Sequence, residues 1–180
     1  AMARLAGIHR AALDESGFAG MPVAKAVQVH GNSVAMVSSG DVFPVPDCDA
    51  LVTLERGLCL GIYVADCAAV FIADKLGRGI ALAHSGRKGT ELGIVPRAID
   101  FLLARTGAAP SDLVLQISPC IRPPHYEVDF AAEIRRQAAE AGVSEIHDNL
   151  RCTAANLSAY YSYRMEKGKT GRLLAAMAMV

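Results

Sequence analysis

Four short apolar segments lie between residues 50 and 84, and they constrain the fold more than any other feature of the chain. They are ALVT (50–53), LCLGIYVA (58–65), AAVFIAD (68–74) and GIALAH (79–84). Their β-branched side chains, and the turn-forming and charged residues between them, favour buried strands. Periodicity alone leaves a helical interpretation of such short runs open.

The other segments predict three helices and further strands. Helices are expected over residues 2–16, 94–105 and 130–141, and the first places Leu5, Ile8, Ala12 and Leu13 on one face. Residues 23–37 predict two strands joined by a tight turn at His30-Gly31-Asn32, followed by a loop over 40–49. Two more strands are expected at 112–118 and in the final TGRLLAAMAMV.

The order of these elements indicates the fold class. Strands outnumber helices and do not alternate with them regularly, which favours a mixed-sheet α+β fold over a doubly wound parallel sheet. The 180 residues, of which 52% are hydrophobic, are enough for one domain with a sizeable core, and no linker or repeat divides them. We therefore expect a single domain over residues 1–180, with Ala1 before Met2 as a residue left by tag cleavage.

Composition excludes several classes of partner. The 18 basic and 18 acidic residues cancel, so no global positive field attracts nucleic acid or an anionic membrane. The apolar runs are too short to cross a bilayer, and the first residues lack a signal-peptide pattern. Five cysteines without a CxxC pair indicate free thiols in a reducing cytoplasm.

Three segments place a metal-ligand residue where an apolar run ends. They are QVHG with His30, VADC with Cys67 and ALAHSG with His84. Two imidazoles and one thiolate suit zinc and leave a fourth position for water or substrate, as in catalytic zinc sites. The same atoms also suit a Cys67 nucleophile with His84 or His30 as its base. Their spacing matches no local metal motif, and each residue alone is also compatible with a structural role.

Several motifs in order resemble the laccase-domain family, also named multicopper polyphenol oxidases of the YlmD/YfiH type. They are QVHGNSV, DALVT, GIYVADCAAVFIAD, ALAHSGRKGTELGI, SPCIRPPHYEVD, Cys152-Thr153, YYSYR and the late GR. The resemblance runs from about residue 27 to the end and implies an α/β/β/α sandwich. It also implies zinc on His30, Cys67 and His84, with Cys67 and His84 catalytic and copper binding in vitro. The implied substrates are purine nucleosides and phosphate, through phosphorolysis of adenosine, inosine and methylthioadenosine and deamination of adenosine.

Four further residues are candidates for substrate binding. Arg87 and Lys88 follow the metal histidine in a glycine-containing turn that we expect to be flexible, and they suit a phosphate or ribose oxygen. Arg164 suits an anion contact, although a surface ion pair is the alternative. The resemblance places Cys120 near the site, where a structural thiol is equally compatible. Asp66 suits orientation of a metal ligand or loop capping, and Tyr126 suits stacking on a purine.

The chain departs from the family pattern at two places. The family usually has a further N-terminal segment with F-x-T-R-x-G-G-like and S-L-N-L-G-like stretches, so we expect a short form. The family commonly reads H-A-G-W-R-G where this chain has HSGRKG, which puts Arg87 in place of tryptophan and Lys88 in place of arginine. Lysine keeps the charge but loses the bidentate fork. These departures affect the substrate-facing residues and leave the metal set intact.

Three other functions compete with a zinc enzyme acting on nucleosides. One is a cysteine-dependent hydrolase or amidase, and the second is a copper polyphenol oxidase, for which one His-Cys-His set offers too few copper centres. The third is a metal-containing module that binds nucleosides without turnover. Assembly into a homo-oligomer is compatible with each of them.

Overall fold

The computed structural model describes residues 2–180, with side chains described from residue 7 onward. Ala1, with its predicted origin in a tag, and the side chain of Leu5 lie outside the described residues. The helices are α1 (Met2–Leu13), α2 (Arg87–Glu91), α3 (Ile94–Thr106) and α4 (Phe130–Glu140). The strands are β1 (Val23–Lys25), β2 (Val34–Met36), β3 (Ala50–Thr53), β4 (Cys59–Val64), β5 (Ala68–Asp74), β6 (Ile80–Ser85), β7 (Leu113–Ile117), β8 (Glu145–Asp148) and β9 (Leu173–Ala178).

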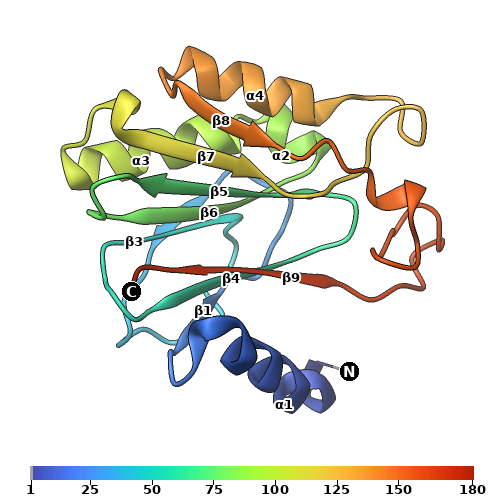
Figure 1. Ribbon diagram of the computed structural model, residues 1–180, viewed down its shortest axis with the longest axis horizontal. Helices are drawn as coiled ribbons and strands as arrows, with labels where there is room; N and C mark the ends of the chain where they lie inside the picture. Colours follow the sequence, from blue (N-terminus) through green and yellow to red (C-terminus); the bar gives the residue numbers. More distant parts are fainter. Residues whose placement is uncertain (1) are drawn as a thin grey trace.

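Two mixed sheets form the centre of the molecule. The smaller sheet has the order β1-β4-β9, and the larger has the order β2-β3-β6-β5-β7-β8. Parallel pairs occur at β1–β4, β2–β3 and β7–β8, and the remaining pairs are antiparallel. Helices α2, α3 and α4 cover the outer side of the larger sheet, and α1 lies beyond the smaller one (Figure 1). The expected α+β fold with an α/β/β/α arrangement is confirmed.

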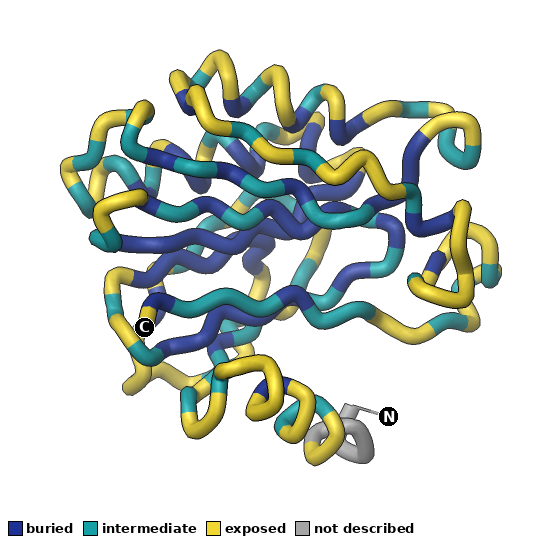
Figure 2. Tube along the Cα trace, viewed as in Figure 1, coloured by how far each residue is buried: buried dark blue, intermediate teal, exposed yellow. Residues whose placement is uncertain are grey.

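Strand β5 shows why the central segments are almost continuously apolar. Ala68, Val70 and Ile72 belong to the core between the larger sheet and the helices, whereas Ala69 and Phe71 belong to the core between the two sheets. Successive side chains of a strand point to opposite faces, so a strand covered on both faces needs apolar residues at nearly every position. Most residues of the central strands β4, β5 and β6 are accordingly buried (Figure 2).

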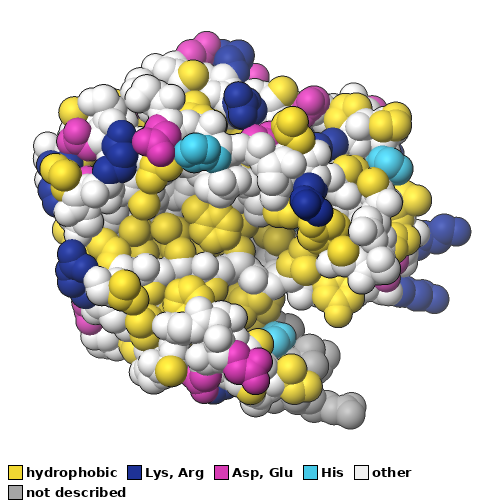
Figure 3. All heavy atoms as spheres, in the orientation of Figure 1, with side chains coloured by type: hydrophobic (Ala, Val, Ile, Leu, Met, Phe, Trp, Pro, Cys, Tyr) yellow, Lys and Arg dark blue, Asp and Glu magenta, His cyan; other side chains and the backbone are white. Residues whose placement is uncertain are grey.

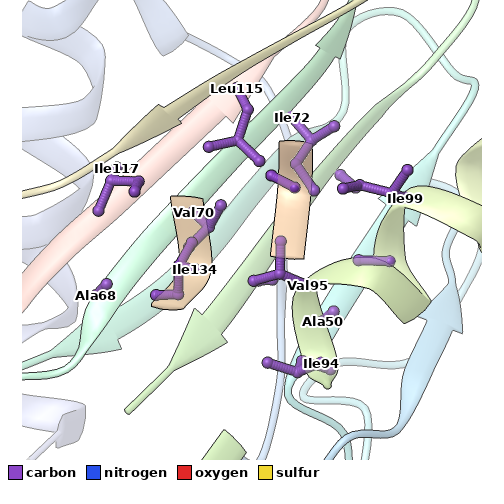
Figure 4. Close-up of a cluster of buried hydrophobic side chains, with 14 of the residues drawn as sticks. Ala50, Ala68, Val70, Ile72, Ile94, Val95, Ile99, Leu115, Ile117 and Ile134 are labelled. Atoms are coloured by element: carbon purple, nitrogen blue, oxygen red, sulfur yellow. The ribbon is translucent and has the colours of Figure 1, made fainter. Parts of the chain in front are cut away.

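The core on the helical side joins helices α3 and α4 to the strands of the larger sheet. Figure 4 shows Ile72 of β5 and Leu115 of β7 near Ile99 of α3 and Ile134 of α4. All four side chains are fully buried. This packing fixes the larger sheet, whose ends carry two of the candidate metal ligands.

Other sequence predictions were wrong in detail. The segments at 23–37 do not form a hairpin, because β1 pairs with β4 and β2 pairs with β3 in the other sheet. In the first helix, Leu13 is buried but Ile8 is 65% exposed, so the predicted apolar face is not the buried one. Strand β8 was not predicted, because its sequence EIHD is half exposed and carries no apolar run.

The smaller sheet leaves part of the larger sheet uncovered. A groove of about 410 Å³ lies beside β9 and includes Phe71 and Ile117 of the larger sheet, and apolar side chains gather along this side of the molecule (Figure 3). Within residues 2–180, no helix combines the length and the apolar character needed to cross a membrane.

Candidate metal centre and its cavity

His30, Cys67 and His84 come together in the folded chain. One potential ligand atom from each lies within 4.8 Å of the others. The imidazole rings of His30 and His84 meet edge to face, with centroids 4.8 Å apart and an interplanar angle of 77°. The structure thus brings together three residues separated by up to 54 positions in the sequence.

Each ligand residue has its own local support. Cys67 lies between β4 and β5, and His84 lies one residue before the end of β6, as the sequence predicts. The expected strand end at His30 was wrong, because β1 ends at Lys25 and His30 lies in a turn with φ 59°. This turn carries the chain from the smaller sheet to the larger one.

Asp49 organises the turn and the second histidine together. Its carboxylate accepts hydrogen bonds from the backbone N–H groups of His30 (3.0 Å) and Gly31 (2.7 Å). It also contacts Nδ1 of His84 at 2.8 Å, while its own carbonyl accepts the His84 N–H at 2.7 Å. Because Nδ1 of His84 is engaged, Nε2 is left to face the site, as in metal-ligating histidines held by a carboxylate.

The segment after His84 is a helix rather than the expected flexible turn. Helix α2 begins at Arg87, and its N-cap is Gly86. A Cβ atom at Gly86 would lie 2.5 Å from Sγ of Cys67, and one at Gly89 would lie 3.4 Å from the carbonyl oxygen of Gly31. These glycines therefore permit close packing around the ligand residues, and mobility is not what they supply.

The three donors fit a metal ion such as zinc. Nitrogen and sulfur ligands of tetrahedral zinc lie roughly 3.3–3.7 Å from each other, which falls inside the 4.8 Å limit observed here. The missing Cβ at Gly86 keeps space open directly beside Cys67. Three protein donors leave a fourth coordination position toward the cavity, which is typical of catalytic sites.

Electrostatics favour a reactive thiol at Cys67. Burial would raise its pKa, but hydrogen bonds and charge from His30 and His84 outweigh burial and lower the pKa to about 7. Burial acts to lower the pKa of His84, yet Asp49 and Cys67 together raise it to about 9. Asp49 is affected in the same way, because hydrogen bonds from His84 and the backbone overcome burial and lower its pKa.

A cavity of about 730 Å³ opens from the three ligand residues. Its walls combine aromatic side chains (Tyr63, Tyr126, Phe130, Tyr163) with cationic ones (Arg87, Arg164, Lys167, Arg172). Of the four predicted substrate-binding residues, Arg87 and Arg164 line it. Lys88 is exposed and Cys120 is fully buried in the helical-side core, and neither lines the cavity.

Cys120 belongs to the structural part of the molecule. The backbones of Cys120 and Cys152 form an isolated β-bridge, not a disulfide. Burial raises the pKa of the Cys120 thiol to about 12. Of the two roles weighed for Cys120, its burial away from the cavity lining favours the structural one, and a part in substrate binding stays a prediction. All five cysteines are free, as predicted.

Glu127 bridges the two arginines at the cavity wall. Its oxygens lie 3.7 Å from Nη1 of Arg87 and 3.0 Å from Nη2 of Arg164. The guanidinium of Arg164 also lies over the ring of Tyr126, 4.8 Å from its centroid. Tyr126 thus lines the cavity as expected for a stacking residue.

Asp66 serves the loop rather than a metal ligand. One carboxylate oxygen accepts from the Thr153 hydroxyl and the other from the backbone N–H of Arg164, each at 2.7 Å. Of the two roles weighed for it, loop capping is the one observed. Sequence reasoning gave no role to Asp49, Lys167 or Arg172, although Asp49 lies in the DALVT motif and Arg172 in the late GR motif of the family resemblance.

Comparison with known proteins identifies the family. The profile of the multi-copper polyphenol oxidoreductase laccase family matches residues 6–133 and 125–180. The chain belongs to this laccase family. The relatives of this chain include a protein of Streptomyces coelicolor named purine nucleoside phosphorylase. It is 34% identical over 81% of this chain and 70% of its own length. Purine nucleoside phosphorylase YlmD of Geobacillus stearothermophilus is 30% identical over 82% of this chain and 69% of its own length.

Two solved structures share the fold of this chain. The crystal structure of YlmD from Geobacillus stearothermophilus superposes with a TM-score of 0.89 at 27% identity, covering 94% of this chain and 78% of that one. The structure of YfiH from Bacillus licheniformis gives 0.85 at 23% identity, which supports the fold alone. Both comparisons agree with the mixed α+β architecture.

Proposed function

We propose that this protein is a zinc-dependent purine nucleoside phosphorylase that holds its metal on His30, Cys67 and His84. The observation that carries the proposal is the convergence of these three donors on a cavity with aromatic and cationic walls. Relatives named purine nucleoside phosphorylase, at 30–34% identity, support the same activity.

The residues of the cavity suit the two halves of a nucleoside and phosphate pair. Tyr126 and Phe130 stand edge to face with centroids 6.0 Å apart and offer ring surface for a purine. Cationic side chains stabilise the negative charge of phosphate. In the reaction, a phosphate oxygen would form a bond to the anomeric carbon of the ribose while the glycosidic bond breaks, and the purine base would leave with a proton. Zinc, when bound, supplies Lewis-acid polarisation of a substrate oxygen. Asp49 keeps His84 oriented for this task.

Product analysis tests this function. Zinc-loaded protein incubated with adenosine and orthophosphate should release adenine and ribose phosphate, and deamination should add inosine. Inosine and methylthioadenosine serve as alternative substrates. Cys67→Ala should abolish turnover, whereas Cys152→Ala, which removes another partly buried thiol, should retain it. Absence of all these products with zinc-loaded wild type would contradict the proposal.

A cysteine-dependent hydrolase is the second candidate, and the contacts of Cys67 with two histidines favour it. Alkylation separates the two functions. A metal-bound thiolate should resist iodoacetamide until zinc is chelated, whereas a free nucleophile should react at once and lose activity. A module that binds nucleoside without turnover would show binding by calorimetry and no product.

The metal and the cellular setting are also part of the proposal. Among the described residues, His30, Cys67 and His84 form the one cluster of three such donors, which suits a single zinc better than a multicopper oxidase. We propose nucleoside and phosphate as the partners in a cytoplasmic setting. Homo-oligomer formation stays a prediction, which sedimentation velocity would test.

A further inference from the structure

The segment before β9, residues 163–172, forms one wall of the cavity. It contributes Tyr163, Arg164, Lys167 and Arg172 to the lining. In Figure 1 this orange-red segment lies at the same end of the molecule as the connection between β4 and β5, which carries Cys67. Of the four residues, only Arg164 was a predicted substrate-binding residue, although Tyr163 and Arg172 lie in the YYSYR and GR motifs.

The segment is locked by its own hydrogen bonds. The carboxylate of Glu166 accepts from the backbone N–H of Ser162 at 3.0 Å and from the hydroxyl of Thr170. The N–H of Gly168 donates to the carbonyl of Tyr163 at 2.8 Å. Lys167 is held in this turn at φ 52°, in the left-handed region that non-glycine residues seldom adopt. The turn therefore fixes the direction in which the Lys167 side chain leaves the backbone.

The charges of the cavity wall are unbalanced. Four cations line the cavity with one carboxylate, that of Asp66, although the whole chain has equal numbers of acidic and basic residues. Both oxygens of Asp66 already accept hydrogen bonds from Thr153 and the Arg164 backbone. This carboxylate has a structural role and does not pair with a lining cation.

The four cations fall into two pairs. Arg87 contacts Glu91 and Glu127, and Arg164 contacts Glu127. Within the side chains that the structure describes, Lys167 and Arg172 make no ion pair. Arg172 donates to the carbonyls of Thr170 and Gly171 and lies over the Tyr163 ring, 5.5 Å from its centroid.

Arg172 and the backbone next to Lys167 both pack against Tyr163. A Cβ at Gly168, the residue after Lys167, would lie 3.3 Å from three atoms of the Tyr163 side chain, while Arg172 lies over its ring. Both cations line the same cavity without a carboxylate partner, so a bound dianion would supply the negative charge that the wall lacks. Arginine adds a planar fork suited to phosphate, and lysine adds a point charge.

We propose that Lys167 and Arg172 form the phosphate subsite of the cavity. The proposal rests on the proposed phosphorylase function and moves the anion contact away from Arg87 and Lys88. Arg87 and Arg164 are already paired with glutamates and are not part of this subsite. The subsite takes a phosphate dianion, either as orthophosphate or as the phosphate group of a nucleotide.

Binding and kinetics test the subsite separately. Calorimetry with orthophosphate alone, and with adenosine 5′-monophosphate, should show binding to zinc-loaded wild type that weakens about tenfold or more in Lys167→Gln and in Arg172→Gln. In the phosphorolysis assay the KM for orthophosphate should rise by a similar factor, with the KM for adenosine within about twofold. Lys169→Gln is the matched control, because Lys169 lies in the same turn, is exposed and does not line the cavity.

The outcomes separate the subsite from the function. Unchanged phosphate binding and an unchanged KM in both variants, or equal losses in Lys169→Gln, would overturn the subsite even if wild type is a phosphorylase. Loss of orthophosphate binding in the two variants, with no phosphorolysis by wild type, would support the subsite and overturn the function. Lys167-dependent binding of the nucleotide alone would support the subsite and identify its phosphate as part of a larger ligand. Wild type that binds neither ligand would overturn the subsite.

Discussion

At the scale of single residues, one carboxylate connects both histidines of the candidate metal centre. Asp49 is fully buried and accepts hydrogen bonds from the turn that carries His30 while it contacts the ring of His84. A buried carboxylate is costly unless its oxygens are satisfied, and here each oxygen has partners. The geometry of the site thus depends on a residue that does not itself face the metal position.

Replacing Asp49 should weaken metal binding without removing a ligand. In Asp49→Asn the acceptor at His84 Nδ1 loses its charge, and zinc affinity should fall roughly 10–100-fold. Competition with a chromophoric chelator at fixed pH measures this change. Asp47→Asn, an exposed neighbour on the same loop, should leave the affinity unchanged, and an equal effect at both positions would contradict the role of Asp49.

Gly86 gives a second test at the residue scale. The methyl group in Gly86→Ala would lie 2.5 Å from Sγ of Cys67, so the thiol must leave its position beside the histidines. We expect loss of most zinc binding, measured by metal content after dialysis, with near-native circular dichroism. Gly40→Ala introduces the same methyl where no atom lies within 4 Å and should bind zinc normally. Normal zinc content in Gly86→Ala would show that this close approach is not needed.

At the scale of elements, β5 contributes side chains to both hydrophobic cores of the molecule. Ile72→Ala should lower the free energy of unfolding by about 2–5 kcal/mol, because this fully buried side chain packs against the helices. Urea denaturation measures the change. Leu76→Ala, in the turn after β5 and 70% exposed, should change stability by no more than about 0.5 kcal/mol. Similar losses in both variants would contradict the assigned core.

Local sequence predicted the elements better than their partners. The strands at 50–84 were recognisable because both of their faces are covered, which forces continuous apolar runs. The pairing of β1 with β4 was not predictable, because Val23 meets Cys59 through the tertiary fold and a nearby turn at His30 suggested a hairpin instead. The glycines of HSGRKG suggested mobility, although Gly86 and Gly89 serve packing around α2.

The candidate site shows the same division between chemistry and placement. His30, Cys67 and His84 were found through their chemistry and the family resemblance, and the structure joins them. The roles of Asp49, Lys167 and Arg172 were missed. Asp49 and Arg172 lie in the DALVT and GR motifs of the resemblance, but a motif does not show what a side chain contacts, and Lys167 looks like an ordinary surface residue in sequence. Their contacts arise only when both sheets and the segment before β9 are in place.

At the scale of the whole molecule, the connections that carry the candidate metal ligands lie at the same end of the two sheets. The turn after β1, the link between β4 and β5, and the end of β6 supply the metal donors, and the segment before β9 adds cations. This arrangement allows chemistry to reside on connections while the cores hold the layers rigid. The relatives named purine nucleoside phosphorylase share this chain over 69–70% of their length.

Anomalous diffraction tests the central claim most directly. Crystals of the protein grown with zinc, measured on both sides of the zinc absorption edge, should show one strong peak bounded by Nε2 of His84, Sγ of Cys67 and the imidazole of His30. The same crystals of Cys67→Ala should lose that peak or show it strongly reduced. A zinc-containing crystal with no peak among these three side chains would contradict the metal centre on which the proposed function stands.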